Sequence, residues 1–96
     1  MTHMVIGTCV CRLRLAGCRS LKDKRRVVRP LVQRLRQKFL VSATEVDLLD
    51  SRNQAVIGMA LVSTDSHHVV AVLERAVTFI DRELPGYLVD YHVEVL

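Results

Sequence analysis

The amino-acid sequence predicts an α+β fold of the ferredoxin-like kind, with the element order βαββαβ. Patterns typical of a strand, a helix, two strands, a helix and a strand follow one another, and no linker or low-complexity segment interrupts them. Half of the 96 residues are hydrophobic, which is enough for one core, so we expect residues 1–96 to form a single domain. Right-handed crossovers then predict a four-stranded antiparallel sheet of order 4-1-3-2 with two helices on one face.

The first strand is predicted over residues 4–15, where side chains alternate between two faces. Its core face holds Val5, Cys9, Cys11, Leu13 and Leu15. Cys9 and Cys11 are expected to be small core residues, because no Cys-x-x-Cys or His-rich pattern supports zinc. An odd number of cysteines leaves at least one unpaired in a monomer, and we expect neither a metal ion nor a cofactor.

A basic helix is predicted over residues 20–39, and it dominates the charge of the chain. At 100° per residue its apolar residues form one stripe, and most of its basic residues form a second stripe about 110° round the axis. Ser20 and Asp23 have the spacing of a capping box at its start. Pro30 lies inside the pattern on the solvent side, so we expect a kink there, after which the helix either continues in a bent form or ends.

The second and third strands are predicted over residues 44–48 and 54–62, with a polar turn between them. In the second strand, alternation places Thr44, Val46 and Leu48 toward the core and Glu45 and Asp47 on the opposite face. The third strand is almost entirely apolar, which predicts a central place in the sheet.

The second helix is predicted to begin at the capping residues 63–66 and to end near Leu84, before a Pro-Gly pair. Its apolar stripe consists of Val69, Leu73, Ala76, Val77, Ile80 and Leu84. The last strand, residues 88–95, alternates with Val89, Tyr91, Val93 and Val95 inward and with Asp90, His92 and Glu94 outward.

The face of the sheet without helices is expected to be open, and its composition argues against RNA recognition by stacking. Base stacking needs exposed aromatic residues on the central strands, and this face has none. Its apolar middle instead predicts a contact with a partner protein or with a second copy of the chain. The residues of that predicted contact are Ile6, Val10, Val56, Ala60 and Val62.

The distribution of charge points to an anionic partner. Residues 1–38 hold eleven basic residues and one acidic residue, whereas residues 39–96 hold three basic and nine acidic residues. Arginine and lysine along one helix suit phosphates, although a solvated basic face is the plain alternative. The phosphate contacts predicted from this pattern are Arg19, Lys22, Lys24, Arg25, Arg26, Arg29 and Arg36. Lys24 points toward the apolar stripe, so either its side chain reaches past the core to water, or the regular helix begins nearer Val27.

Catalysis has little support in the sequence. The row Asp90, His92 and Glu94 is more typical of cross-strand pairing than of acid–base chemistry, and no phosphate-binding glycine loop or nucleophile motif is present. We therefore expect a protein that is not an enzyme. No apolar run reaches the roughly 18–20 residues that span a membrane, and no signal peptide is recognisable, so we expect a cytoplasmic protein without a membrane partner.

Segments 19–28, 35–39, 41–45 and 55–63 together resemble the YlxP-like family, a group of small bacterial proteins defined as a domain of unknown function. The most specific part is the S-L-K-[DE]-K-R pattern at residues 20–25, directly after the first strand. The resemblance covers nearly the whole chain and implies a ferredoxin-like fold. Genes of this family often lie near that of ribosome-binding factor A, which implies work on ribosomal RNA or the ribosome. The family has no established activity and no catalytic residues to transfer.

Two functions are therefore expected. The first is a non-enzymatic RNA- or ribosome-associated protein that docks on phosphates through the helix of residues 20–39. The second is a protein-interaction module or homodimer that uses the open face of the sheet and binds no nucleic acid.

Overall fold

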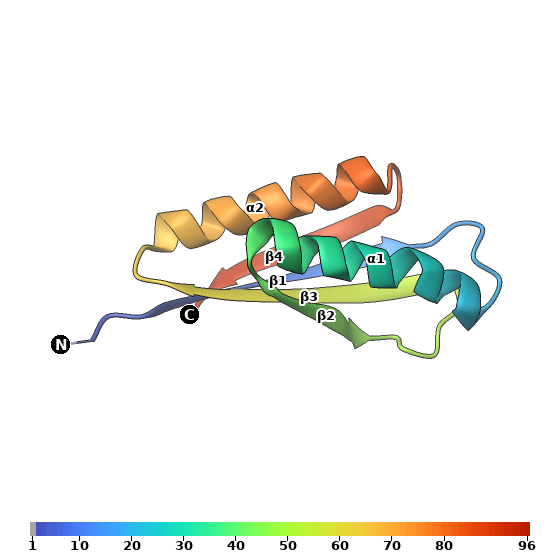
Figure 1. Ribbon diagram of the computed structural model, residues 1–96, viewed down its shortest axis with the longest axis horizontal. Coiled ribbons are helices and arrows are strands. Elements are labelled where there is room, and N and C mark those ends of the chain that lie inside the picture. Colours follow the sequence, from blue (N-terminus) through green and yellow to red (C-terminus); the bar gives the residue numbers. More distant parts are fainter. Residues whose placement is uncertain (1) are drawn as a thin grey trace.

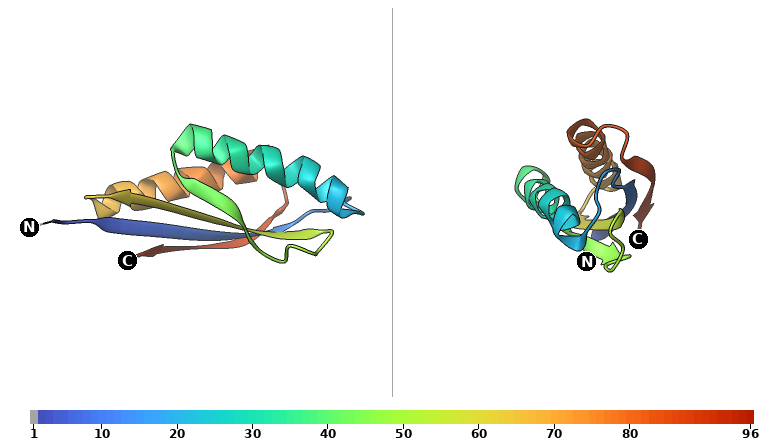
Figure 2. Two further views of the ribbon diagram at one scale, coloured as in Figure 1. Left: turned by 60° about the horizontal axis from the view of Figure 1, so that its bottom comes forward. Right: turned by 90° about the vertical axis from the view of Figure 1, so that its right-hand side faces the viewer.

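The protein is described by a computed structural model that covers residues 2–96 (Figure 1). The helices and strands are β1 (Val5–Arg14), α1 (Leu21–Phe39), β2 (Ser42–Asp47), β3 (Gln54–Ser63), α2 (Ser66–Glu83) and β4 (Leu88–Val95). The strands form one antiparallel sheet of order β2-β3-β1-β4, and both helices cover the same face of it (Figure 2). The predicted ferredoxin-like fold and strand order are confirmed.

The core lies between the sheet and the two helices. Inward side chains of the central strands β1 and β3, among them Leu13 and Ile57, are fully buried against Leu35 of α1 and Leu73 and Ile80 of α2. Helix α1 packs mainly on β2, while α2 packs on β1, β3 and β4. This division leaves one long side of α1 facing solvent beside the edge of the sheet.

Helix α2 approaches β1 closely at Gly7. A methyl group on Gly7 would overlap Cγ1 of Val69 and lie 3.1 Å from Cδ1 of Leu73. Glycine therefore lets the helix sit directly on the strand, and the two buried side chains fill the space that a larger residue would need.

Helix α1 runs without interruption through Pro30, which is exposed. Ser20 is its N-cap, and the Ser20 hydroxyl accepts a hydrogen bond of 3.0 Å from the backbone N–H of Asp23. The Asp23 carboxylate accepts one of 3.0 Å from the N–H of Arg19, and this bond is the main reason that the pKa of Asp23 lies below its ordinary value. The predicted capping box is confirmed, and the proline does not end the helix.

Strand β2 has the opposite phase from the one predicted. Ala43 is buried and Glu45 is half-buried on the helix side, whereas Val46 and Leu48 are 51% and 39% exposed. A register shift between Glu45 and Asp47, where β2 pairs with β3, marks a bulge. The prediction was wrong because it treated a glutamate as an outward residue, although this one faces a buried partner on α1.

No helix within residues 2–96 combines the length and the apolarity needed to cross a membrane.

Candidate nucleic-acid interface on helix α1

Five of the predicted phosphate contacts lie exposed on α1 or directly before it. They are Arg19, Lys22, Arg25, Arg26 and Arg29. Within residues 2–96, none of them lies within ion-pair distance of an acidic side chain, and the one acid of α1, Asp23, accepts a hydrogen bond from the backbone N–H of Arg19. Their charges are therefore directed into solvent and are available to an anionic partner.

Arg36 occupies the same side of α1, two turns beyond Arg29. Its Nε donates a hydrogen bond of 2.9 Å to the carbonyl oxygen of Ala43 in β2. This contact fixes the guanidinium at the rim between helix and strand while the residue stays exposed. We call Lys22, Arg25, Arg26, Arg29 and Arg36 the basic stripe.

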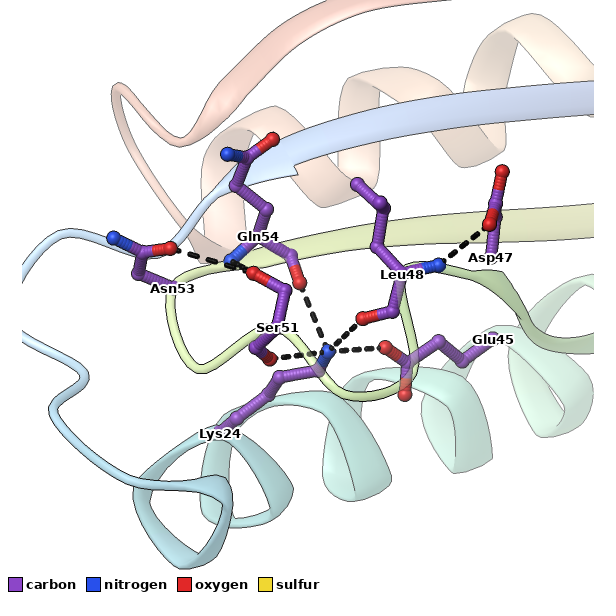
Figure 3. A network of polar contacts seen from close by, with 7 residues as sticks. All are labelled: Lys24, Glu45, Asp47, Leu48, Ser51, Asn53 and Gln54. Carbon is purple, nitrogen blue, oxygen red and sulfur yellow. Dashed lines mark hydrogen bonds and ion pairs between the residues drawn. The ribbon is translucent and has the colours of Figure 1, made fainter.

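Lys24 was predicted to contact phosphate, and the structure contradicts this. Only 2% of the residue is exposed. Its Nζ donates hydrogen bonds to the carbonyl oxygens of Leu48 at 2.8 Å, Ser51 at 2.8 Å and Gln54 at 2.9 Å (Figure 3). Lys24 therefore binds the loop between β2 and β3, with its ammonium turned away from water. Helix α1 begins at Leu21, so a later start does not explain the inward position.

Glu45 completes this network. Its Oε2 lies 2.6 Å from Nζ of Lys24, yet it receives no well-aligned hydrogen bond. An ammonium group has three protons, and the three carbonyl oxygens take them, so Glu45 contributes mainly as a counter-ion. The pair neutralises a charge that would otherwise be costly to bury.

A groove runs between α1 and the edge of the sheet. Its lining comes from the exposed side of α1, from β2 and from the loop after it, and consists of Leu21, Lys24, Arg25, Val28, Arg29, Val32, Gln33, Arg36, Thr44, Glu45 and Leu49. The basic stripe supplies Arg25, Arg29 and Arg36 to this α1–β2 groove, and Glu45 is its one acidic residue. The sequence analysis missed Glu45 here because it assigned that side chain to the other face of the sheet.

The open face of the sheet has the predicted apolar middle, but one predicted residue is buried and another residue is exposed in its place. Val10 and Val62 are 42% and 63% exposed, and Ile6 and Ala60 are half-buried. Val56 is only 7% exposed, so it was wrong to count it as contact surface. Val46 takes its place beside a shallow apolar hollow over Gly58, because the shifted phase of β2 turns this side chain to the open face.

Aromatic side chains lie away from this face in the part of the chain that the structure describes. Phe39 and Phe79 pack edge to face at the ends of α1 and α2, with ring centroids 5.6 Å apart. The hydroxyl of Tyr87 donates to the carbonyl oxygen of Ala16 at 3.0 Å, and that of Tyr91 donates to Oε2 of Glu74 on α2 at 2.8 Å. The sheet therefore offers no base-stacking platform.

The polar row on β4 makes surface contacts, one of which is an ion pair across two strands. Asp90 lies 3.8 Å from Arg12 on β1, as the cross-strand reading predicted, and Nε2 of His92 lies 3.8 Å from Oε1 of Glu94. All four side chains are more than half exposed, so these pairs are screened by water. Among residues 2–96, no cluster of three or more His, Cys, Asp or Glu side chains is suited to a metal ion.

The sequence matches a protein family and an uncharacterised relative over most of its length. The family described as "Protein of unknown function (DUF503)" matches residues 6–93. "Uncharacterized protein YlxP" of Bacillus subtilis (strain 168) is 32% identical over 77 residues, which cover 80% of this chain and 84% of that protein.

Two solved structures show the same architecture at low sequence identity. "De novo designed protein Foldit4" has a TM-score of 0.64 at 12% identity and covers 98% of this chain and 97% of its own. An uncharacterized NIPSNAP-like domain protein from Burkholderia xenovorans has a TM-score of 0.51 at 15% identity, with 100% and 85% covered. Since a designed protein shares it, the fold carries no information about function, which must be argued from side chains.

Proposed function

We propose that this chain, which belongs to the DUF503 family of proteins of unknown function, is a non-enzymatic cytoplasmic protein that docks on the phosphates of ribosomal RNA or of the ribosome. The observation that carries the proposal is the basic stripe together with Arg19. These side chains are exposed on one side of one helix, and no acidic side chain within residues 2–96 pairs with them.

The geometry of α1 suits a polyanion better than a single small anion. Lys22 and Arg36 are fourteen residues apart, which corresponds to about 21 Å along a helix at 1.5 Å per residue. At the start of the helix, Ser20 and Asp23 already accept hydrogen bonds from local N–H groups, and Asp23 adds a negative charge there. A ligand that places several phosphates along the helix therefore gains more than one that binds at the N-terminus.

Binding of this kind depends on salt and only weakly on sequence. Each phosphate that a Lys or Arg neutralises releases counter-ions, so log K falls by roughly 0.7–0.9 per contact for each tenfold rise in salt. The concentration of positive charge within residues 1–38 also speeds the encounter with RNA at low ionic strength.

The experiment that tests the proposal measures binding of structured ribosomal RNA fragments across a salt series. The protein is compared with a variant in which Lys22, Arg25, Arg26 and Arg29 are changed to glutamate. Lys24 is left unchanged, because it stabilises the loop between β2 and β3. The matched control is Arg75→Glu with Arg82→Glu on α2, set against a two-site α1 variant, Arg25→Glu with Arg29→Glu, which changes the net charge by the same amount.

We expect micromolar or tighter binding with a steep salt dependence, lost in the α1 variant and largely kept in the α2 variant. Absence of binding at low salt would refute the proposal. If RNA affinity falls equally in both two-site variants, the binding depends only on net charge, and a specific role for α1 is refuted.

A second candidate function is association through the open face of the sheet, favoured by the exposure of Val10, Val46 and Val62 around the apolar hollow over Gly58. A homodimer through this face is expected to become monomeric when Val10 and Val62 are both changed to aspartate. Light scattering after size-exclusion chromatography measures this directly, and a wild-type protein that is already monomeric at micromolar concentration argues against self-association.

A further inference from the structure

The α1–β2 groove contains a carboxylate whose position is fixed. Oε2 of Glu45 is held 2.6 Å from the ammonium of Lys24, and Lys24 is itself held by three loop carbonyls (Figure 3). The other oxygen, Oε1, accepts no hydrogen bond from residues 2–96. The side chain is 19% exposed and lines the groove, so Oε1 is an acceptor that a ligand can reach.

The charges at the rim of the groove restrict the charge of a ligand that can bind there. Arg25, Arg29 and Arg36 line the groove together with Glu45, and none of the three lies within ion-pair distance of it. Three guanidinium groups repel a cationic ligand such as an arginine or lysine of a partner protein. The negative charge of Glu45 is offset by Lys24, so the groove as a whole remains positive. The fitting ligand is therefore anionic overall but carries N–H donors at its inner end.

An unpaired nucleotide of RNA has both properties. Its phosphates match the arginines of the rim, and its base presents donors on the edge that pairing would otherwise occupy. Guanine offers two adjacent donors, N1–H and the 2-amino group, whereas adenine has an acceptor at N1 beside a single amino group. Among the apolar residues of the groove, Leu49 is 60% exposed and can lie against a planar base, whereas Val28 and Val32 belong to the core.

We propose that the α1–β2 groove binds an unpaired guanine of RNA and that Glu45, oriented by Lys24, is the residue that reads it. The inference rests on the proposed docking of α1 on RNA and adds a base preference to that site. Glu45 accepts the guanine donors through Oε1, while Arg25, Arg29 and Arg36 contact the adjoining phosphates.

The test uses nine-nucleotide single-stranded RNAs made of adenosine, which has no ring N–H donor on its pairing edge, with guanosine, inosine or adenosine at the centre. Inosine keeps N1–H but lacks the 2-amino group, so it separates the two donors. Fluorescence anisotropy at low salt should show the guanosine RNA binding roughly tenfold tighter than the adenosine RNA, with inosine between them.

Two variants probe the reading residue. Glu45→Gln keeps an oxygen for Lys24 but turns an amide N–H₂ toward the groove, and Leu49→Arg places a guanidinium where it can occupy Oε1. Leu49 is 60% exposed, so this second change spares the buried pair if Glu45→Gln fails to fold. We expect both variants to bind all three RNAs equally and with the salt dependence retained. Asp47→Asn, an exposed acid on the same strand outside the groove, is the control that keeps the preference.

The outcomes separate this inference from the docking proposal. Binding that depends on the basic stripe but shows no preference for guanosine overturns the guanine site and leaves docking intact. A preference that survives in both variants also overturns it. If no RNA binds at low salt, both proposals fail together.

Discussion

Nζ of Lys24 lies 2.8 Å from the carbonyl oxygen of Leu48, a residue in the left-handed region at φ 55°. A side chain with a Cβ pays roughly 1–2 kcal/mol for that conformation. The hydrogen bond turns the Leu48 carbonyl toward the ammonium, together with those of Ser51 and Gln54. One lysine of α1 thus ties together three carbonyl groups of the segment between β2 and β3, where the N–H of Ser51 also donates to the Leu48 carbonyl at 3.0 Å.

Replacing this lysine tests that role. Lys24→Met keeps the length and apolar stem of the side chain but removes the charge, leaving Glu45 and three carbonyl oxygens without their partner. Removing one partner of a buried ion pair leaves the other charge, here the Glu45 carboxylate, without compensation. We therefore expect a loss of about 3–5 kcal/mol in the free energy of unfolding. Urea denaturation measures it. The matched control is Lys22→Met, an exposed neighbour expected to change stability by about 0.5 kcal/mol or less. Equal stability of the two variants would contradict the structural role of Lys24.

The two glycines of the central strands should respond differently to alanine. Gly7→Ala overlaps the buried Val69, so we expect a loss of about 1–3 kcal/mol in unfolding free energy. In Gly58→Ala the new methyl group lies 2.7 Å from Cγ1 of Val46, a half-exposed side chain that is free to rotate away. We expect this second variant to be near neutral. A double variant Gly7→Ala, Val69→Ala that is no less stable than Val69→Ala alone would confirm the cause, and additive losses would point elsewhere.

Tyr91 provides a prediction at alkaline pH. Its hydroxyl donates to Glu74, and this hydrogen bond is the main reason that the pKa of Tyr91 is raised above its ordinary value of about 10. A raised pKa in the folded state means that the contact stabilises fully below the unfolded value and is lost as the pH rises through the folded one. Ultraviolet titration of a Tyr87→Phe variant, in which Tyr91 is the remaining tyrosine, should give a midpoint above 10. Adding Glu74→Gln should lower that midpoint, and an unchanged midpoint would disprove the assigned cause.

Long patterns with one dominant period could be predicted well from the sequence. The apolar stripe of α2 left one arrangement that buries its side chains, and the strand order followed from right-handed crossovers. The alternation of β4 predicted the strand but overstated its burial, because Val89, Tyr91 and Val95 are 53%, 43% and 40% exposed. The capping box of Ser20 and Asp23 likewise depends only on local spacing. These features need no knowledge of distant contacts.

Strand β2 and Lys24 could not be predicted for the same physical reason. The phase of a six-residue strand rests on two or three side chains, and here an inward position belongs to Glu45, whose charge is offset by Lys24. Considered separately, Lys24 and Glu45 are each expected on the protein surface, because charged residues are rarely buried. The inward position of Lys24 on the helix was the one signal in the sequence. A buried lysine needs an acidic partner, and a search for one on a neighbouring strand would have identified Glu45.

The edge strands of the sheet determine whether two copies of this protein can pair strand to strand during folding. Strand β2 is short and bulged, so it is a poor template for another strand. Strand β4 is longer, its register shift against β1 lies near its start at Val89, and Asp90, His92 and Glu94 alternate along the rest. Two β4 strands paired antiparallel about His92 would set Asp90 of one copy opposite Glu94 of the other, and like charges in that position repel. The acidic edge thus discourages fibril-like growth by strand addition while leaving the open face free for contacts.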